Sequence, residues 1–116
     1  MADDNLALLQ GTLDVLVLKA LIFQPLHGYA VARWIRDTTE GALEIEEGAL
    51  YTALHRLEKR RWLASEWGLS ENNRRAKYYA LTAEGRKRLA ARERSWIRYA
   101  EAVFKVLGAA EARGAG

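Results

Sequence analysis

The residues best suited to binding chemistry lie in one short stretch, "NNRRAKYY", at residues 72–79. Its hydrogen-bond donors are Asn73, Arg74, Arg75 and Lys77. The stretch lies between two runs of strand-forming residues, as the turn of a β-hairpin would. Guanidinium and ammonium groups bind phosphates and carboxylates through charge-assisted hydrogen bonds. The stretch therefore indicates a turn that binds an anion.

A second set of donors lies on a predicted helix that begins at Glu46-Glu47-Gly48, where acidic residues suit the positive end of the helix dipole. Leu50, Leu54 and Leu57 follow at i, i+4 and i+7 and form its apolar face. The outward positions are then Tyr51, Thr52, His55, Arg56, Lys59 and Arg60.

In the simplest interpretation, these outward residues form a solvated helix face with no ligand. In the functional interpretation the partner is a nucleic acid. Arg56 then lies at base edges or on a phosphate, and Lys59 and Arg60 lie on phosphates. Tyr51 has two equal alternatives, packing against the hairpin or offering its hydroxyl to a phosphate. His55 is a weaker candidate for the same contacts.

The charge of the chain is unevenly distributed. Residues 1–54 hold three Lys/Arg against eight Asp/Glu, residues 55–94 hold twelve against five, and residues 95–116 hold three against two. The middle segment thus carries more than the whole net charge of +3. Concentrated positive charge of this kind favours a polyanionic partner such as a nucleic acid.

Several classes of function lack support in the sequence. The chain has no cysteine, and its two histidines, His27 and His55, lie on different predicted helices. No metal-ligand spacing, nucleophile–base pair or glycine-rich phosphate loop is present. We expect no catalysis, no metal and no cofactor.

The sequence also indicates where the chain acts. The absence of cysteine fits a reducing cytoplasm. The beginning of the chain is acidic, unlike a signal peptide. The longest apolar stretch, "VLVLKALIF", is too short to span a membrane. We expect a cytoplasmic protein with no membrane partner.

The elements that position these residues follow from the apolar pattern. Residues 12–23 predict a buried helix, and a second helix follows the break "QPLHG" and ends near residues 38–41. The segment "ALEIE" is a short strand or an extended linker. The third helix and the hairpin come next, and Thr82 predicts an N-cap for a last helix that runs to about Leu107.

Three helices followed by a hairpin predict a winged helix-turn-helix, mainly α with a small β-hairpin. The predicted domains are a DNA-binding winged helix at residues 1–81, a dimerisation helix at 82–108 and a disordered tail at 109–116. In this fold the hairpin tip is a wing that lies along the DNA backbone. The third helix would enter the major groove.

The last predicted helix carries an apolar stripe that the small core cannot cover. Its members are Trp96, Ile97, Ala100, Val103, Phe104 and Leu107. We expect this stripe to form a homodimer interface, with Leu6 and Leu9 packed against it. The alternative is packing within the chain. Trp96 is first an interface anchor, and it is also a candidate for stacking on a planar aromatic effector.

Four motifs in order, "LLQGTLDVLVLKAL", "HGYAVARWI", "EEGALYTALHRLEKRRWL" and "NNRRAKYYALTAEGRKRL", resemble the PadR family of bacterial transcriptional regulators, in its short branch. The resemblance covers about residues 8–89. It implies a homodimeric winged-helix repressor that binds double-stranded DNA at a pseudo-palindromic operator and is released by an effector. Ala49, Thr52 and Arg61 depart from the family pattern, where Ser or Thr, Pro and Gly are expected.

Two other functions remain open from the residues alone. A winged helix can bind an acidic protein partner through the same basic face, because fold does not fix function. Such a surface would expose apolar anchors on the third helix, whereas polar and cationic residues are expected there. An RNA-binding role lacks an aromatic platform for single-stranded bases.

Overall fold

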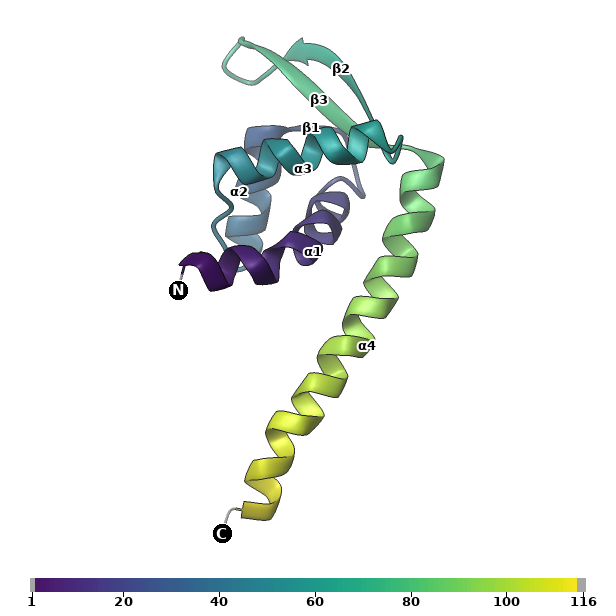
Figure 1. Ribbon diagram of the computed structural model, residues 1–116. Helices are drawn as coiled ribbons and strands as arrows, with labels where there is room; N and C mark the ends of the chain where they lie inside the picture. The colour runs from purple at the N-terminus through teal and green to yellow at the C-terminus, as the bar shows by residue number, and fades with distance from the viewer. Residues whose placement is uncertain (1, 115–116) are drawn as a thin grey trace.

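The computed structural model describes residues 2–114, with side chains for residues 11–109. The elements are α1 (Ala2–Ala20), β1 (Leu26–His27), α2 (Gly28–Thr38), α3 (Glu47–Lys59), β2 (Leu63–Leu69), β3 (Arg75–Leu81) and α4 (Ala83–Gly114). Figure 1 shows α1, α2 and α3 grouped beneath the β2–β3 hairpin, while α4 leaves this body as one long helix. The predicted winged helix with a long C-terminal helix is confirmed.

The leucine stripe of α3 builds the core. Leu50, Leu54 and Leu57 are each no more than 2 % exposed, as their spacing predicted. They join Leu18 of α1 and Leu21, which directly follows α1, in one buried cluster. Full burial of one such side chain contributes roughly 1.5–3 kcal/mol. The apolar face therefore fixes which side of α3 is left for a ligand.

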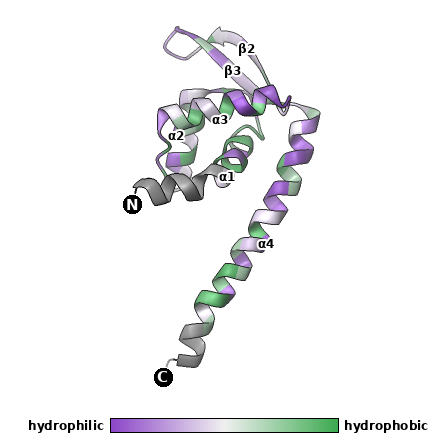
Figure 2. Ribbon diagram, in the orientation of Figure 1, coloured by the Kyte–Doolittle hydropathy of each residue, from purple (hydrophilic) through white to green (hydrophobic). Residues whose placement is uncertain are grey.

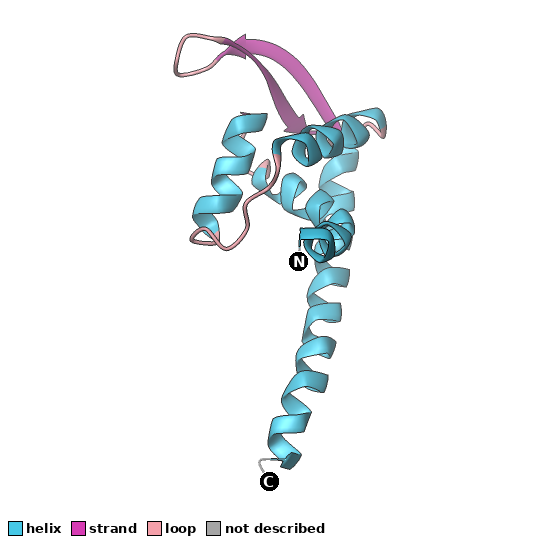
Figure 3. Ribbon diagram, turned by 60° about the vertical axis from the view of Figure 1, so that its left-hand side comes forward, coloured by secondary structure: helices cyan, strands magenta, loops and turns pink. Residues whose placement is uncertain are grey.

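The predicted hairpin forms a wing above α3. β2 and β3 pair antiparallel, from Leu63 opposite Leu81 to Leu69 opposite Arg75. Figure 3, turned by 60°, shows that the two strands and their turn extend beyond the helices. The wing is therefore anchored at its base, while most of its turn projects away from the helical core.

Strand β1, which adds a third strand to the hairpin, is absent from the elements that the sequence predicts. Leu26 pairs with Tyr79 and His27 with Tyr78, which gives a three-stranded sheet in the order β1-β3-β2. Two residues are too short to produce an alternating pattern, so the segment was interpreted as a break. Successive residues of a strand point to opposite faces, and of this pair Tyr79 is only 2 % exposed whereas Tyr78 is half-buried.

The junction between the wing and α4 confirms the predicted cap. The Gly85 N–H donates to Thr82 Oγ1 at 2.9 Å, so Thr82 is the N-cap. A Cβ added to Gly85 would overlap the carbonyl oxygen of Trp62. Only glycine fits there, because the first turn of α4 crosses the chain directly after α3.

Two helices are longer than predicted. α1 occupies Ala2–Ala20 instead of residues 12–23, and α4 continues to Gly114 instead of ending near Leu107. An apolar stripe marks only the part of a helix that packs, and helix ends carry no such signal. Beyond Leu107 the chain is rich in alanine, a strong helix former, so residues 109–114 of the predicted tail are helical.

The end of α3 is unusual in its residue type. Arg61 has φ +65°, in the left-handed region that favours glycine. Its N–H donates to the Glu58 carbonyl at 2.9 Å, and the Trp62 N–H donates to the Leu57 carbonyl at 3.0 Å. This pair of bonds is the Schellman arrangement that closes many helices. An arginine therefore occupies a position where glycine would be unstrained.

Candidate nucleic-acid interface

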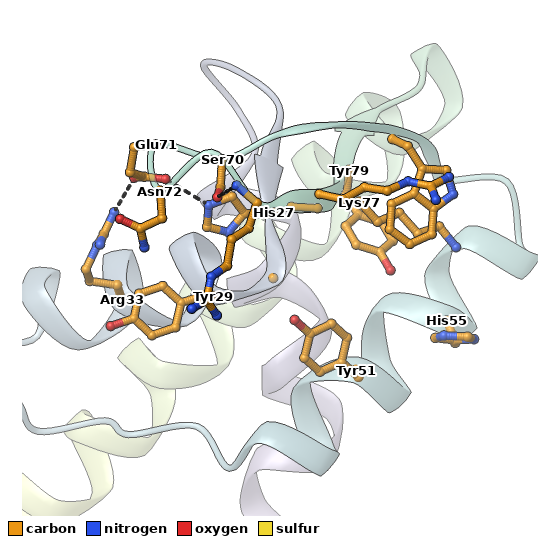
Figure 4. A pocket seen from close by; sticks show the side chains of 15 residues that line it. His27, Tyr29, Arg33, Tyr51, His55, Ser70, Glu71, Asn72, Lys77 and Tyr79 are labelled. Carbon is orange, nitrogen blue, oxygen red and sulfur yellow. Dashed lines mark hydrogen bonds and ion pairs between the residues drawn. The ribbon is translucent and has the colours of Figure 1, made fainter.

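A groove lies between the wing and the helices beneath it, with a volume of about 830 Å³ (Figure 4). We call it the wing groove. Its lining comes from the start of α2, the outer face of α3 and the wing. The lining residues are His27, Gly28, Tyr29, Arg33, Tyr51, His55, Trp67, Ser70, Glu71, Asn72, Arg74, Arg75, Ala76, Lys77 and Tyr79. The groove therefore gathers cations that are distant in the sequence.

The wing turn presents its donors as the sequence predicted. Asn73 has φ +60°, a conformation that asparagine tolerates better than most residues. Its N–H donates to the Ser70 carbonyl at 2.8 Å, and the Ser70 N–H donates to the Arg74 carbonyl at 2.8 Å. Arg74 and Arg75 are exposed on this closed turn. The backbone thus holds both guanidinium groups at the wing tip.

Aromatic rings and one carboxylate orient the cations further along the wing. The Arg75 guanidinium lies 4.5 Å from the centre of the Trp67 ring. Lys77 lies 5.7 Å from the centre of the Tyr79 ring, and its Nζ is 3.5 Å from Glu58 Oε1 on α3. Such contacts orient a cation while leaving much of its charge facing water. Lys77 is therefore less free than Arg74 and Arg75.

Most of the outward residues of α3 lie where they were expected. The exposed side chains are Tyr51, Thr52, His55, Lys59 and Arg60. Arg60 also lies 5.3 Å from the centre of the buried Trp62 ring, which Arg88 and Arg92 of α4 approach as well. Apart from Tyr51, this face of α3 is polar or cationic.

Arg56 is only partly outward: its side chain is 31 % exposed and its guanidinium is paired with Asp14, so a DNA contact of Arg56 stays a prediction. Its Nη2 is 2.5 Å from Asp14 Oδ1, and its Nε is 3.4 Å from Oδ2. Asp14 is the one charged residue among the buried ones in the described chain, at 5 % exposure. A buried carboxylate needs a partner, and Arg56 supplies it from α3. This ion pair could not be predicted from the sequence, because Asp14 lies in an otherwise apolar helix and no local pattern points to its partner.

Tyr51 spans the gap between α3 and the start of α2. A Cβ added to Gly28 would lie 2.6 Å from the Tyr51 hydroxyl oxygen and 2.7 Å from Cζ, so the ring packs against the glycine. Tyr51 is still 37 % exposed. The ring therefore packs against the start of α2 and lines the wing groove, while a contact of its hydroxyl with a phosphate stays a prediction.

Three residues of the groove were missed by the sequence analysis, and they are His27, Arg33 and Glu71. Figure 4 shows Glu71 of the wing turn reaching toward His27 and Arg33. Glu71 Oε1 is 3.3 Å from His27 Nε2, and Oε2 is 3.5 Å from Arg33 Nη2. Their separation of some forty residues in the chain leaves no local pattern that could have found the cluster.

Two carboxylates of this region have pKa values below the usual range. The pKa of Glu58 is lowered first by the hydrogen bond from Ser65, and further by Lys77. The pKa of Glu71 is lowered by its own backbone N–H and then by His27 and Arg33. Both groups are therefore anions at neutral pH, and both tie the wing to the helices.

The apolar stripe of α4 remains exposed among the residues whose side chains are described. Trp96, Ile97, Phe104 and Leu107 are 42 %, 49 %, 68 % and 66 % exposed. Ala100 and Val103 are half-buried on the same stripe. Figure 2 shows hydrophobic residues concentrated in the distal part of α4, whereas its first turns are hydrophilic.

The predicted partners of this stripe at the beginning of the chain, Leu6 and Leu9, lie outside the residues whose side chains are described. Trp96 Nε1 donates to Thr12 Oγ1 of α1 at 3.0 Å. Thr12 and Trp96 line a hollow of about 350 Å³ together with Gly11, Val15, Arg92, Ser95 and Tyr99. The indole is therefore oriented by α1 beside an open hollow.

Within the described residues, no three His, Asp or Glu side chains are grouped so that they could hold a metal ion. No helix of the described chain is long and apolar enough to cross a membrane.

Comparison with known proteins identifies a common architecture. The model of the transcriptional regulator PadR-like family matches residues 17–91. A PadR family transcriptional regulator from Eggerthella lenta is 36 % identical, with 91 % of this chain and 90 % of that chain covered at a TM-score of 0.74. A transcriptional regulator from Clostridium thermocellum is 31 % identical, with 85 % and 96 % covered at a TM-score of 0.77. An uncharacterized protein from Lysinibacillus sphaericus is 26 % identical over 83 % of this chain and 88 % of that protein.

Proposed function

Because the chain belongs to the PadR-like family of transcriptional regulators, which are not enzymes, we propose that it is a homodimeric repressor that binds a specific DNA operator. The observation that carries the proposal is the wing groove. It places exposed Arg74 and Arg75 on the wing opposite the polar outer face of α3. A wing on the backbone and a helix in the major groove form a common arrangement for reading duplex DNA.

We assign the contacts by what each residue can reach. Arg74 and Arg75 bind phosphates at the wing tip, with Asn73 as a neutral donor beside them, and Lys77 binds a phosphate nearer α3. On α3, Thr52 and His55 face the bases, while Tyr51, Lys59 and Arg60 contact the backbone. Arg56 is left out of this set because its guanidinium is paired with Asp14.

The exposed stripe of α4 supports the homodimer. A contiguous apolar surface on one face of a helix is stabilised when a second copy covers it. Symmetry then supplies a second wing groove and predicts a pseudo-palindromic operator. Repression itself rests on the family resemblance.

Release by an effector is a further part of the proposal. Trp96 lies on the dimer stripe beside the hollow that it shares with Thr12, which suits a planar aromatic compound. Planar aromatic compounds titrated into the protein should quench tryptophan emission. In Trp96→Phe, which keeps an apolar anchor, the quenching should be smaller by the part of the signal that Trp96 contributes. An unchanged response in that variant would contradict the assignment, since Trp34, Trp62 and Trp67 would account for the signal.

Binding to an acidic protein partner has less support from the described surface. Its discriminating feature was a set of apolar anchors on α3, and Tyr51 is the one large exposed hydrophobic residue there among those described. The polar character of the other outward residues suits the edges of base pairs.

The test is binding of the purified protein to a labelled duplex from its own upstream region, beside a scrambled duplex, over a range of salt concentrations. The proposal predicts preference for the upstream duplex and a steep fall of affinity with salt, by about 0.9 log unit per log unit of salt for each phosphate contact. Equally weak, salt-insensitive binding to both duplexes would contradict it.

A further inference from the structure

One acidic side chain lies in the wing groove among several cations. Its lining holds the cations Arg33, Arg74, Arg75 and Lys77 and the two histidines His27 and His55, with Glu71 as the one carboxylate. Glu71 extends from the exposed wing turn and reaches the wall formed by α2 (Figure 4). A carboxylate at this place repels any polyanion that enters the groove. Its position among the cations therefore needs an explanation of its own.

The groups that hold Glu71 are themselves oriented by the fold. His27 Nδ1 accepts a hydrogen bond from the Ala30 N–H at 3.1 Å, as the N-cap of α2. The neutral ring must then carry its proton on Nε2, the atom 3.3 Å from Glu71 Oε1. The edge of the ring is also fixed against Tyr78, with 5.3 Å between the ring centres. His27 is thus a donor aimed into the groove.

The second donor, Arg33, lies six residues after His27, which is nearly two turns along α2. The Arg33 guanidinium lies 5.4 Å from the centre of the Tyr29 ring, which faces the same groove. Its Nη2 is 3.5 Å from Glu71 Oε2. Two oriented donors, one at the N-cap of α2 and one within α2, therefore converge on the two oxygens of one anion.

We propose that His27 and Arg33 form a further phosphate-binding site for the DNA backbone, and that Glu71 occupies this site while no DNA is bound. This inference rests on the proposed DNA-binding function. A carboxylate and a phosphate offer the same kind of acceptor to a guanidinium and an imidazole N–H. Exposed ion pairs of this length are weak, so a DNA phosphate can replace the carboxylate at little cost.

The exchange gives the wing two positions. Without DNA, the carboxylate holds the wing turn against α2. When a phosphate takes the site, Glu71 is released and the wing tip is free to follow the DNA backbone. The neutralised site also keeps His27 and Arg33 from binding other anions loosely, which lowers binding to DNA of any sequence.

The test begins with Glu71→Gln, which removes the charge but keeps the size of the side chain. Loss of the competing anion should tighten binding to both the upstream and the scrambled duplex roughly two- to fivefold at 0.1 M salt, and steepen the salt dependence by about one unit of slope. The matched control is Glu66→Gln, which removes an exposed carboxylate from β2 outside the groove lining. The control should gain clearly less. Weaker binding of Glu71→Gln would overturn the proposal, because the contact would then prepare the wing for DNA.

A double-mutant cycle separates site occupancy from simple repulsion. Arg33→Ala should weaken binding more in the Glu71→Gln background than in the parent, since only there is the guanidinium free at the start. If the gain from Glu71→Gln persists in full without Arg33, Glu71 acts by repulsion alone and the site assignment fails.

A measurement without DNA tests the contact itself. Amide hydrogen exchange in the wing turn, residues 70–74, should be faster in Glu71→Gln than in the parent and unchanged in Glu66→Gln. Equal exchange in all three proteins would show that Glu71 does not hold the wing, whatever the DNA result. If instead the parent binds no duplex at any salt concentration, the proposed function fails first, and the phosphate site fails with it.

Discussion

The wing groove and the distal part of α4 leave opposite kinds of side chain uncovered. The groove exposes guanidinium groups that aromatic rings orient, such as Arg75 on Trp67. The distal part of α4 exposes Phe104 and Leu107, which nothing in the described chain covers. Charges that water already solvates gain from a polyanion through counterion release, whereas apolar side chains gain from leaving water. The two surfaces should therefore bind different partners and respond differently to salt.

The largest effect is expected from breaking the apolar surface. Phe104→Asp places a charge in the stripe and should convert the dimer into a monomer. Loss of the second half-site contact should weaken operator binding roughly a hundredfold or more, because two linked sites bind by avidity. Sedimentation and duplex titration measure both outcomes.

Ala102→Asp is the matched control, because a spacing of 100° per residue puts it on the opposite side of α4 from the stripe. It should remain dimeric. A dimeric Phe104→Asp would assign the stripe to another partner. Dimerisation of the parent should also persist at salt concentrations that abolish DNA binding, which distinguishes the two surfaces directly.

Removing the charges of the wing tip should have the next largest effect. Arg74→Ala/Arg75→Ala should weaken binding to all duplexes alike, by roughly tenfold at 0.1 M salt, and flatten the salt dependence by about two units of slope. Arg36→Ala/Lys105→Ala removes the same charge outside the groove lining and should leave the slope unchanged. An unaltered slope in the wing variant would contradict the phosphate contacts.

Arg56 sharpens the comparison, because it is a half-buried cation that pairs with the buried Asp14 and does not line the groove. Asp14→Ala leaves the Arg56 guanidinium without its partner and should lower the free energy of unfolding by about 1–3 kcal/mol. Chemical denaturation of the parent, Asp14→Ala and Arg56→Ala measures this. Arg56→Ala should lower stability while the base preference of the protein stays the same, and relaxed preference at one base pair would return Arg56 to the DNA surface.

The end of α3 offers a change that stabilises the fold and leaves the lining of the groove intact. Arg61→Gly relieves an arginine at φ +65° and should raise the free energy of unfolding by about 1 kcal/mol. Arg61→Ala removes the same charge without the conformational freedom of glycine, so it should not stabilise. Thermal unfolding compares the two, and equal melting temperatures would show that the left-handed turn costs nothing.

The smallest effect concerns the tie between wing and α3. Ser65 and Lys77 lower the folded-state pKa of Glu58 below its usual value near 4.5. Its stabilisation is therefore fully present above the unfolded-state pKa and is lost as pH falls through the lower folded-state pKa. Glu58→Gln should be less stable than the parent at pH 7, by about 0.2–1 kcal/mol. Denaturation at pH 7 and pH 3 should show this difference shrinking, and a constant difference would contradict the ion-pair account.

The sequence predicted what depends on local periodicity. The Leu50, Leu54 and Leu57 spacing placed α3 and its buried face, and Thr82 placed the start of α4. The wing turn followed from its turn-forming residues and charges. These features were accessible because each arises from neighbours within a few residues.

The sequence did not predict contacts between distant segments. The Asp14–Arg56 pair joins α1 to α3, and a carboxylate in an apolar helix gives no sign of its partner. The Glu71 contacts to His27 and Arg33 depend on how the wing folds back over α2. β1 has two residues and forms only because β3 is already beside it. Tertiary packing decides all three features.

The most direct test of the account is amide hydrogen exchange of the parent protein with and without a duplex from its upstream region. The account predicts that DNA slows exchange in the wing turn and along the outer face of α3. It also predicts that the stripe of α4 is protected equally with and without DNA, because the proposed dimer would cover it in both cases. DNA-induced protection confined to α4, or none in the wing, would contradict the assignment of the wing groove as the DNA-binding surface.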